Sequence, residues 1–408
     1  MTQAGISRRI TTTMKMVAPL MSFMNESIWA ERIREGDPDV CDFTLGNPHD
    51  MPLPEFSAAL QRWATPQNKD WYAYKMNERD AQEVVANSLR QQRGLPFEPD
   101  DIFLTNGAIA AIAVTLALLT NPGDEIIFIS PPWFFYEAMI AANGGRPVRV
   151  RVDMQTFDLD LDAIDRALTP ATRAIIVNSP HNPTGKLYPP QTLEGLARRL
   201  TRASRRFGHP IYLLSDESYC RIVYEGRTYH SPTAFYPNTF LLYTYGKTLL
   251  TPGQRLGYIA LPPAMPDRAD WRQAITLAQF MTGYAFPNAL LQHALPDLER
   301  LSIDVGHLQR KRDRMVRALR EQGYDVHLPE GTFYLLPRSP LDDDMAFINR
   351  LASQNVFCLP GSLADAPGYF RISLTANDDM IERALPRFAA AIRAPAQPQP
   401  GAVVAEVR

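Results

Sequence analysis

The sequence is poor in cysteine, and this shortage argues against two kinds of protein. Its 408 residues contain three cysteines, Cys41, Cys220 and Cys358. They are odd in number, lie far apart and lack the spacing of metal ligands, so we expect neither a disulfide scaffold nor a metal centre. A reduced, cytoplasmic protein is the simple expectation.

The sequence also lacks an excess of either charge and a long apolar run near its start. Lysine and arginine number 42 against 44 aspartates and glutamates, and the net charge is -2. Because the basic residues are scattered, neither nucleic acid nor an anionic membrane is expected as a partner. The apolar stretch at residues 16–23 is too short to span a membrane, is broken by Pro19 and has no cleavage pattern after it. We expect it to form a short helix or arm that packs against the body.

The chain does contain a large apolar fraction and a regular alternation of strands and helices. With 45% hydrophobic residues it can bury a large core, in two domains or in one large domain with a satellite. Continuous apolar strands that alternate with helices predict an α/β fold with a mostly parallel sheet covered on both faces. We expect strands at 102–105, 125–129, 147–152, 174–177 and 211–216, and helices at 80–90, 109–119 and 191–207.

Four residues that suit chemistry or ligand binding follow the apolar strands of this region: Gly107, Asn182, Asp216 and Lys247. In open parallel sheets, ligands bind outside the carboxyl ends of the strands. We therefore expect these residues to meet at one edge of the sheet and to form a site there.

Lys247 stands where the apolar run that begins at residue 241 ends, and Arg255 follows eight residues later. A lysine in apolar surroundings loses hydration, which favours the neutral amine that forms Schiff bases with aldehydes. The planar guanidinium of Arg255 could clamp a dianionic group. An edge lysine and a surface arginine are the alternative interpretation.

The pattern changes after residue 261 and predicts a connection to a second, carboxyl-terminal domain. A long helical region is expected at 267–320, with interruptions near Pro287. Strands are expected at 331–336, 356–361 and 369–374, and helices at 344–354 and 378–392. The proline-rich end, residues 394–408, is expected to be disordered.

Several motifs occur in a fixed order along the chain: Asn182-Pro-Thr-Gly185, Asp216-x-x-Tyr219, Thr244-x-x-Lys247 and Arg255-x-Gly257. Together they resemble the pyridoxal-phosphate-dependent class I/II aminotransferases, which have the aspartate-aminotransferase-like fold type I. The resemblance runs from residue 46 to residue 371, nearly the whole chain. It implies a large domain with a mostly parallel sheet flanked by helices, plus a smaller α/β domain built from the two chain ends. The expected division is 1–50 (arm and part of the small domain), 51–290 (large domain), 291–393 (small domain) and 394–408 (tail).

The resemblance implies roles for the central residues of the site. Lys247 would form the aldimine with pyridoxal 5'-phosphate and move the proton between the substrate carbon and the cofactor carbon. Asp216 would keep the ring nitrogen protonated, so that the ring acts as an electron sink. Asn182 and Tyr219 would hydrogen-bond the phenolic oxygen of the cofactor. A helix cap is the structural alternative for Asp216.

The phosphate of the cofactor would lie at a helix start, where free amides and the helix dipole favour anions. The residues that this implies are Gly107, Ala108 and Ile109, with Thr244 and Arg255. Trp133 would stack on the cofactor ring, with a core tryptophan as the alternative. Tyr72 matches a residue that in the family reaches in from a partner subunit, so a homodimer is expected.

On the substrate side, Arg371 matches the arginine that grips the α-carboxylate of an amino acid. Gly46 permits a close approach of backbone to ligand, or is an ordinary turn glycine. The family implies substrate contact for Asn182 as well. Ile109 stands where some aspartate-specific members carry a lysine, which weakens aspartate as the substrate. Apolar residues expected around the pocket favour an aromatic or bulky neutral substrate: Trp133, Phe134, Phe135, Tyr284 and Phe286.

The chain also departs from the family at the residue before the lysine. That position is often a hydroxyl or small residue that contacts the phosphate. Here it is Gly246, so one phosphate contact is expected to be missing.

The function implied is an aminotransferase that moves an amino group between an L-amino acid and a 2-keto acid. The same cofactor cage also serves β-lyases, decarboxylases, cyclases and oxidases, and the sequence leaves these open. A remote alternative is a regulatory protein that senses pyridoxal phosphate. Such regulators carry a helix-turn-helix domain ahead of this fold, and the 45 residues before Gly46 are too few for one.

Overall fold

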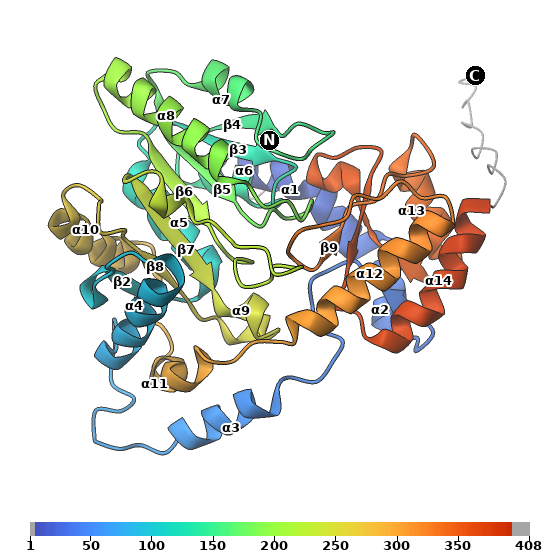
Figure 1. The fold of residues 1–408 in the computed structure, drawn as a ribbon, viewed down its shortest axis with the longest axis horizontal. Helices are drawn as coiled ribbons and strands as arrows, with labels where there is room; N and C mark the ends of the chain where they lie inside the picture. The colour runs from blue at the N-terminus through green and yellow to red at the C-terminus, as the bar shows by residue number, and fades with distance from the viewer. Residues whose placement is uncertain (1–4, 394–408) are drawn as a thin grey trace.

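The computed structural model describes residues 5–393, and its largest element is a seven-stranded sheet (Figure 1). The strand order is β2-β8-β7-β6-β5-β3-β4. Neighbours run parallel except β8, which is antiparallel to both β7 and β2. The predicted mostly parallel α/β sheet is confirmed. The strands are β2 (Ile102–Thr105), β3 (Glu125–Ser130), β4 (Arg146–Arg151), β5 (Thr172–Asn178), β6 (Tyr212–Asp216), β7 (Thr239–Thr244) and β8 (Gly257–Ala260).

Helices flank this sheet: α4 (Arg79–Arg93), α5 (Gly107–Leu119), α7 (Leu161–Ala167), α8 (Pro190–Phe207), α10 (Arg268–Met281) and α11 (Ala289–Leu298). Helix α3 (Pro54–Trp63) packs on α11. Alternate strand residues point to opposite faces. Ile126 and Phe128 of β3 pack in one cluster with residues of α5 and α10. Ile127 and Ile129 pack in another with residues of α7 and α8. Because both faces are buried, the central strands are continuously apolar, and each such side chain stabilises the fold by about 1.5–3 kcal/mol.

The two ends of the described chain meet in a second hydrophobic cluster beside the large sheet. Strand β1 (Cys41–Asp42) pairs in parallel with β10 (Val356–Phe357). In Figure 1 the two dark-blue helices, α1 and α2, lie beside the orange and red carboxyl-terminal elements. One cluster of buried residues joins α1 (Arg8–Glu26), α2 (Ile28–Glu35), α12 (Val305–Glu321), α13 (Asp344–Ala352), α14 (Asp378–Arg393) and the antiparallel sheet of β11 (Leu359–Pro360), β12 (Phe370–Ser373) and β9 (Tyr334–Leu335).

Most expected elements occur, with shifted boundaries. The helical region expected at 267–320 consists of α10, α11 and α12, because a loop around Pro287 and another before residue 305 break it. The strand expected at 331–336 is reduced to β9, since only Tyr334 and Leu335 pair with β12. Helices α3, α6 (Tyr136–Ala142) and α7 were not predicted.

The expected amino-terminal arm is the helix α1, whose Leu20 and Phe23 are buried against the body. Between residues 5 and 393, no helix is long and apolar enough to cross a membrane. The tail expected at 394–408 lies outside the described residues.

Candidate active site

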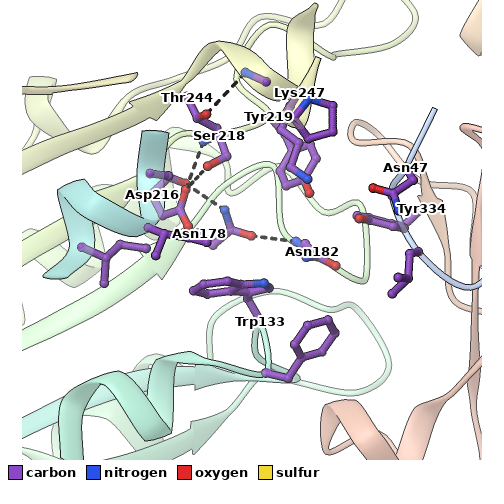
Figure 2. A pocket seen from close by; sticks show the side chains of 18 of the residues that line it. Asn47, Trp133, Asn178, Asn182, Asp216, Ser218, Tyr219, Thr244, Lys247 and Tyr334 are labelled. Carbon is purple, nitrogen blue, oxygen red and sulfur yellow. Dashed lines mark hydrogen bonds between the residues drawn. The ribbon is translucent and has the colours of Figure 1, made fainter. Parts of the chain in front are cut away.

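A cavity of about 290 Å³ lies at the carboxyl ends of β5, β6 and β7 (Figure 2). Residues from the large sheet line it together with residues of β9 and β12. Thirteen of the residues singled out from the sequence are among its lining residues: Gly46, Ala108, Ile109, Trp133, Phe134, Asn182, Asp216, Tyr219, Thr244, Gly246, Lys247, Arg255 and Arg371. Of the four residues expected to meet at one edge of the sheet, Asn182, Asp216 and Lys247 line the cavity. Gly107 does not line it and lies behind Arg255, which does.

Lys247 lies one turn beyond the end of β7, on the short helix α9 (Tyr245–Thr248), and not on the strand itself. Thr244 caps that helix by accepting a hydrogen bond from the Gly246 amide at 3.4 Å. The Lys247 Nζ atom is 5.7 Å from the ring centre of Tyr219 and 5.6 Å from that of Phe333. Lys247 is thus half-buried, and its amine lies near two aromatic rings at the cavity.

Asp216 is the last residue of β6, and its carboxylate is held by donors on both oxygens. Oδ2 accepts a hydrogen bond from the Tyr136 hydroxyl at 2.5 Å. Oδ1 accepts from the Ser218 amide at 3.1 Å and from the Ser218 hydroxyl at 2.5 Å. Burial and the neighbouring carboxylate both raise the pKa of Tyr136 well above its usual value, so this phenol stays a donor. The arrangement fixes an acceptor in the cavity wall.

The turn after β5 presents Asn182 through a chain of hydrogen bonds. The Asn178 side chain donates to the Asp216 carbonyl at 2.9 Å and accepts from the Asn182 amide at 2.8 Å. Figure 2 shows this chain running from Asp216 to Asn182 along the cavity wall. The Asn182 Oδ1 atom in turn accepts from Arg371 at 3.3 Å. The side-chain nitrogen of Asn182, Nδ2, is therefore left to donate into the cavity.

Arg371 is a buried cation whose hydrogen-bond partners are neutral. It lies on β12, is 2% exposed, and donates to Asn182 and to the Thr44 carbonyl at 3.0 Å. Its Nε atom is buried and has no hydrogen-bond partner within the described residues. Aromatic rings flank it, with the guanidinium carbon 4.2 Å from the Tyr334 ring centre and 5.6 Å from that of Phe134. A buried charge without an anion is costly, so this position favours an incoming carboxylate.

Arg255 is a second arginine whose hydrogen bonds go to neutral groups. It donates to the Pro252 carbonyl at 2.7 Å and to the Asn106 carbonyl at 3.3 Å, and burial lowers its pKa. Arg255 lies against Gly107, the first residue of α5. A Cβ atom on Gly107 would stand 2.7 Å from the Nη2 atom of Arg255. Gly107 also has a φ of +80°, so a side chain is disfavoured twice over. The arginine and the free amides at the start of α5 form a cradle for an anion.

Some residues expected at the site do not line the cavity. Tyr72 is 52% exposed, and its hydroxyl donates to the Ala64 carbonyl at 2.5 Å. Phe135 packs edge-on against Trp133, and Phe286 packs with Tyr74 and Phe280. Of the five aromatic residues expected around the pocket, Trp133 and Phe134 line it, whereas Phe135, Tyr284 and Phe286 do not.

Sequence reasoning missed several lining or supporting residues: Asn178, Ser218, Tyr136 and Tyr334. Tyr136 and Ser218 stand three and two residues from Trp133 and Asp216, so their spacing along the chain was a usable signal. Tyr334 offered none, because a tyrosine in a short apolar strand reads as core.

Comparison with known proteins supports the same resemblance. A family model described as aminotransferase class I and II matches residues 38–388. The aspartate/prephenate aminotransferase of Thermus thermophilus is 31% identical over 94% of this chain and 98% of its own length. The aromatic-amino-acid aminotransferase 2 of Thermococcus litoralis is 26% identical over 87% of this chain and 92% of its own.

Solved structures resemble the whole fold. An amino transferase from Eubacterium rectale has a TM-score of 0.84 at 27% identity, covering 95% of this chain and 96% of its own. The aspartate aminotransferase of Thermus thermophilus with maleate has a TM-score of 0.79 at 27% identity, covering 95% of this chain and 100% of its own.

Proposed function

The chain belongs to the class I and II aminotransferase family, and on this premise we propose that its cavity binds pyridoxal 5'-phosphate at Lys247 and an amino acid at Arg371. The enzyme is an aminotransferase that moves an amino group between an amino acid and a 2-keto acid. Names of relatives that describe transamination favour this reaction over the other chemistry that the cofactor supports.

One observation carries the proposal: two arginines with only neutral hydrogen-bond partners line the same cavity as a lysine and a held carboxylate. The substrate–cofactor pair brings two anionic groups, a phosphate and an α-carboxylate. Arg255, Thr244 and the start of α5 fit the phosphate, and Arg371 fits the carboxylate. The residues present therefore suit the cofactor.

When bound, pyridoxal phosphate supplies an electron sink for the bond that breaks at the α-carbon of the substrate. The Asp216 carboxylate would keep the ring nitrogen of the cofactor protonated. Hydrogen bonds from Tyr136 and Ser218 orient that carboxylate. The Asn182 amide and the Tyr219 hydroxyl would donate to the phenolic oxygen of the cofactor.

The remaining roles concern the ring face and the proton. Trp133, which lines the cavity, would stack on the ring. Lys247 Nζ would attach the cofactor and, once displaced by the substrate amine, would carry the proton away from the α-carbon. Gly46 lines the cavity beside Arg371 and leaves room for the substrate backbone.

The enzyme is proposed to act as a homodimer. An exposed apolar surface supports this: Tyr72, Tyr74, Leu277, Phe280, Met281 and Phe286. Within it, Phe286 contacts both Tyr74 and Phe280, which makes part of the surface contiguous. Contiguous exposed apolar area of this kind marks interaction sites. In such a dimer Tyr72 of each chain would reach the cofactor phosphate of the other.

The proposed amino-acid substrate has an uncharged, bulky or aromatic side chain. The cations that line the cavity among residues 5–393 are Lys247, Arg255 and Arg371, and each already has a proposed partner. No further cation in the described lining is left for a side-chain carboxylate. Ile109 and Phe134 add apolar wall. We expect kcat/KM for phenylalanine to exceed that for aspartate by about tenfold or more.

The domain division is proposed at residues 50/51 and 290/291. The shared cluster of the two chain ends supports a small domain built from both ends. The second boundary falls within α11, whose buried residues pack with the large sheet. A reducing, cytoplasmic location is proposed because Cys41, Cys220 and Cys358 are all free and buried.

The experiment that tests the function incubates the pure protein with a panel of amino acids and either pyruvate or 2-oxoglutarate. New keto acid and new amino acid should form in equal amounts, without ammonia. Ammonia in amounts that match keto acid would instead indicate elimination or oxidation. Lys247→Ala should form neither product. Its matched control is Lys311→Ala, which should keep the activity, since Lys311 is a buried lysine outside this cavity.

A further inference from the structure

Tyr334 is a buried lining residue to which neither the motifs nor the proposed mechanism gives a role. It lies on β9, is 3% exposed, and forms part of the cavity wall. Figure 2 shows it on the side of the cavity away from Asp216, beside Asn47. A Cβ atom at Gly46 would stand 2.5 Å from its hydroxyl oxygen. Because Gly46 has no side chain, the Tyr334 hydroxyl can occupy this position at the cavity.

The ring of Tyr334 supports Arg371. The guanidinium carbon lies 4.2 Å from the ring centre, well within the distance for a cation–π interaction. Residues Ser373 and Tyr334 are direct partners in the antiparallel pair of β12 and β9, and Arg371 is two residues from Ser373 on β12. The strand pairing thus brings the ring under the arginine. Because the hydrogen bonds of Arg371 use Asn182 and Thr44, the ring is a third support for its orientation.

The rings of Tyr334 and Tyr219 meet edge-on with their centres 6.0 Å apart, and their hydroxyls form a hydrogen bond. Burial raises the pKa of Tyr334, but the positive charges of Arg371 and Lys247 and the Tyr219 hydroxyl outweigh it, so its pKa lies below the usual value. Burial raises the pKa of Tyr219 well above its usual value, and the nearby Tyr334 and Asp216 raise it further against the effect of Arg371. Each phenol has one proton to donate. Because Tyr219 is proposed to give its proton to the cofactor, its oxygen is left to accept from Tyr334.

We propose that Tyr334 is a positioning residue: its ring holds the Arg371 guanidinium toward the substrate, and its hydroxyl donates to Tyr219. The proposal rests on the function proposed above, in which Tyr219 gives its own hydrogen bond to the phenolic oxygen of the cofactor. A phenol that accepts a hydrogen bond becomes a better donor. Tyr334 therefore strengthens the bond from Tyr219 and helps to stabilise the anionic form of that oxygen.

Two variants separate the hydroxyl from the ring. Tyr334→Phe removes the donor and keeps the ring, so the pH at which the absorption of the bound cofactor changes should rise by about 0.5–1 unit, measured without substrate. In this variant the KM for the amino acid should stay within about threefold of the wild type. Tyr334→Leu also removes the ring, and its KM should exceed that of the phenylalanine variant by about three- to thirtyfold.

The matched control is Tyr236→Phe, which removes a buried hydroxyl that donates to the Ile211 carbonyl at 2.6 Å, outside the cavity. It should leave both the titration and KM unchanged. A titration midpoint in Tyr334→Phe that stays the same or falls would overturn the proposal, as would equal KM values in the two Tyr334 variants. If circular dichroism shows that the leucine variant does not fold, the titration of the phenylalanine variant decides alone. A wild-type protein that binds no cofactor would refute the proposed function instead.

Discussion

Replacing Arg371 by lysine keeps a positive charge in the cavity but removes the planar fork of donors. Arg371 is 2% exposed and held by Asn182, Thr44 and the Tyr334 ring, so its direction is set before a substrate arrives. A lysine cannot grip both oxygens of a carboxylate at once. We expect the variant to lose about 2–4 kcal/mol of transition-state stabilisation, which lowers kcat/KM by roughly thirty- to a thousandfold.

The lost contact is to the α-carboxylate of the substrate. The amino acid and the keto acid both carry this group. KM should therefore rise for both substrates together, while the absorption of the bound cofactor stays the same. The lost hydrogen bonds to neutral oxygens should lower the free energy of unfolding by only about 1–2 kcal/mol.

The assay measures steady-state kinetics with both substrates, the absorption spectrum and thermal unfolding. Arg314→Lys is the matched control, because Arg314 makes a two-donor pair with Glu382 on the surface. It should leave the kinetics unchanged. If Arg371→Lys instead unfolds or loses cofactor, and the surviving protein binds substrate normally, Arg371 is a structural residue and the carboxylate is held elsewhere.

Three further predictions concern the cofactor, the dimer and pH. Asp216→Asn should fold but lose at least about a hundredfold in kcat, since an amide cannot keep the ring nitrogen protonated; near-normal turnover would remove this role. Light scattering should give twice the chain mass of 45.9 kDa, and a monomer that stays fully active at nanomolar concentration would contradict the dimer and the role of Tyr72. Burial lowers the pKa of His181 from 6.5 to about 4, so the unfolded state takes up a proton first as pH falls. The free energy of unfolding should therefore drop by about 3 kcal/mol between pH 6.5 and 4, and His181→Gln should flatten this slope in urea titrations; an equal slope would refute it.

The sheet and most of the cavity could be predicted because their signals are local. Buried parallel strands need unbroken apolar residues, and the residues that follow such strands must meet at one edge. Asn182, Asp216 and Lys247 each stand at the end of such a strand or shortly after it, and each lines the cavity. Their positions relative to the predicted strands were sufficient to predict that they share one site.

What could not be predicted depends on contacts between distant segments. Tyr334 becomes a lining residue because β9 pairs with β12 and so brings it under Arg371, a pairing that leaves no trace in a two-residue strand. Phe286 lies outside the cavity because it packs with Tyr74, which is more than two hundred positions away. Tyr72 has no place in the cavity of its own chain, and its proposed role requires a second copy.

The most direct test of the account asks whether Lys247 carries the cofactor. The purified protein should absorb in the near-ultraviolet or visible range, and borohydride reduction should fix the cofactor covalently. Peptide mapping by mass spectrometry should find the added mass on Lys247, and Lys247→Ala should carry none. An adduct on another lysine, such as the buried Lys311 outside the cavity, would contradict the assignment of this site.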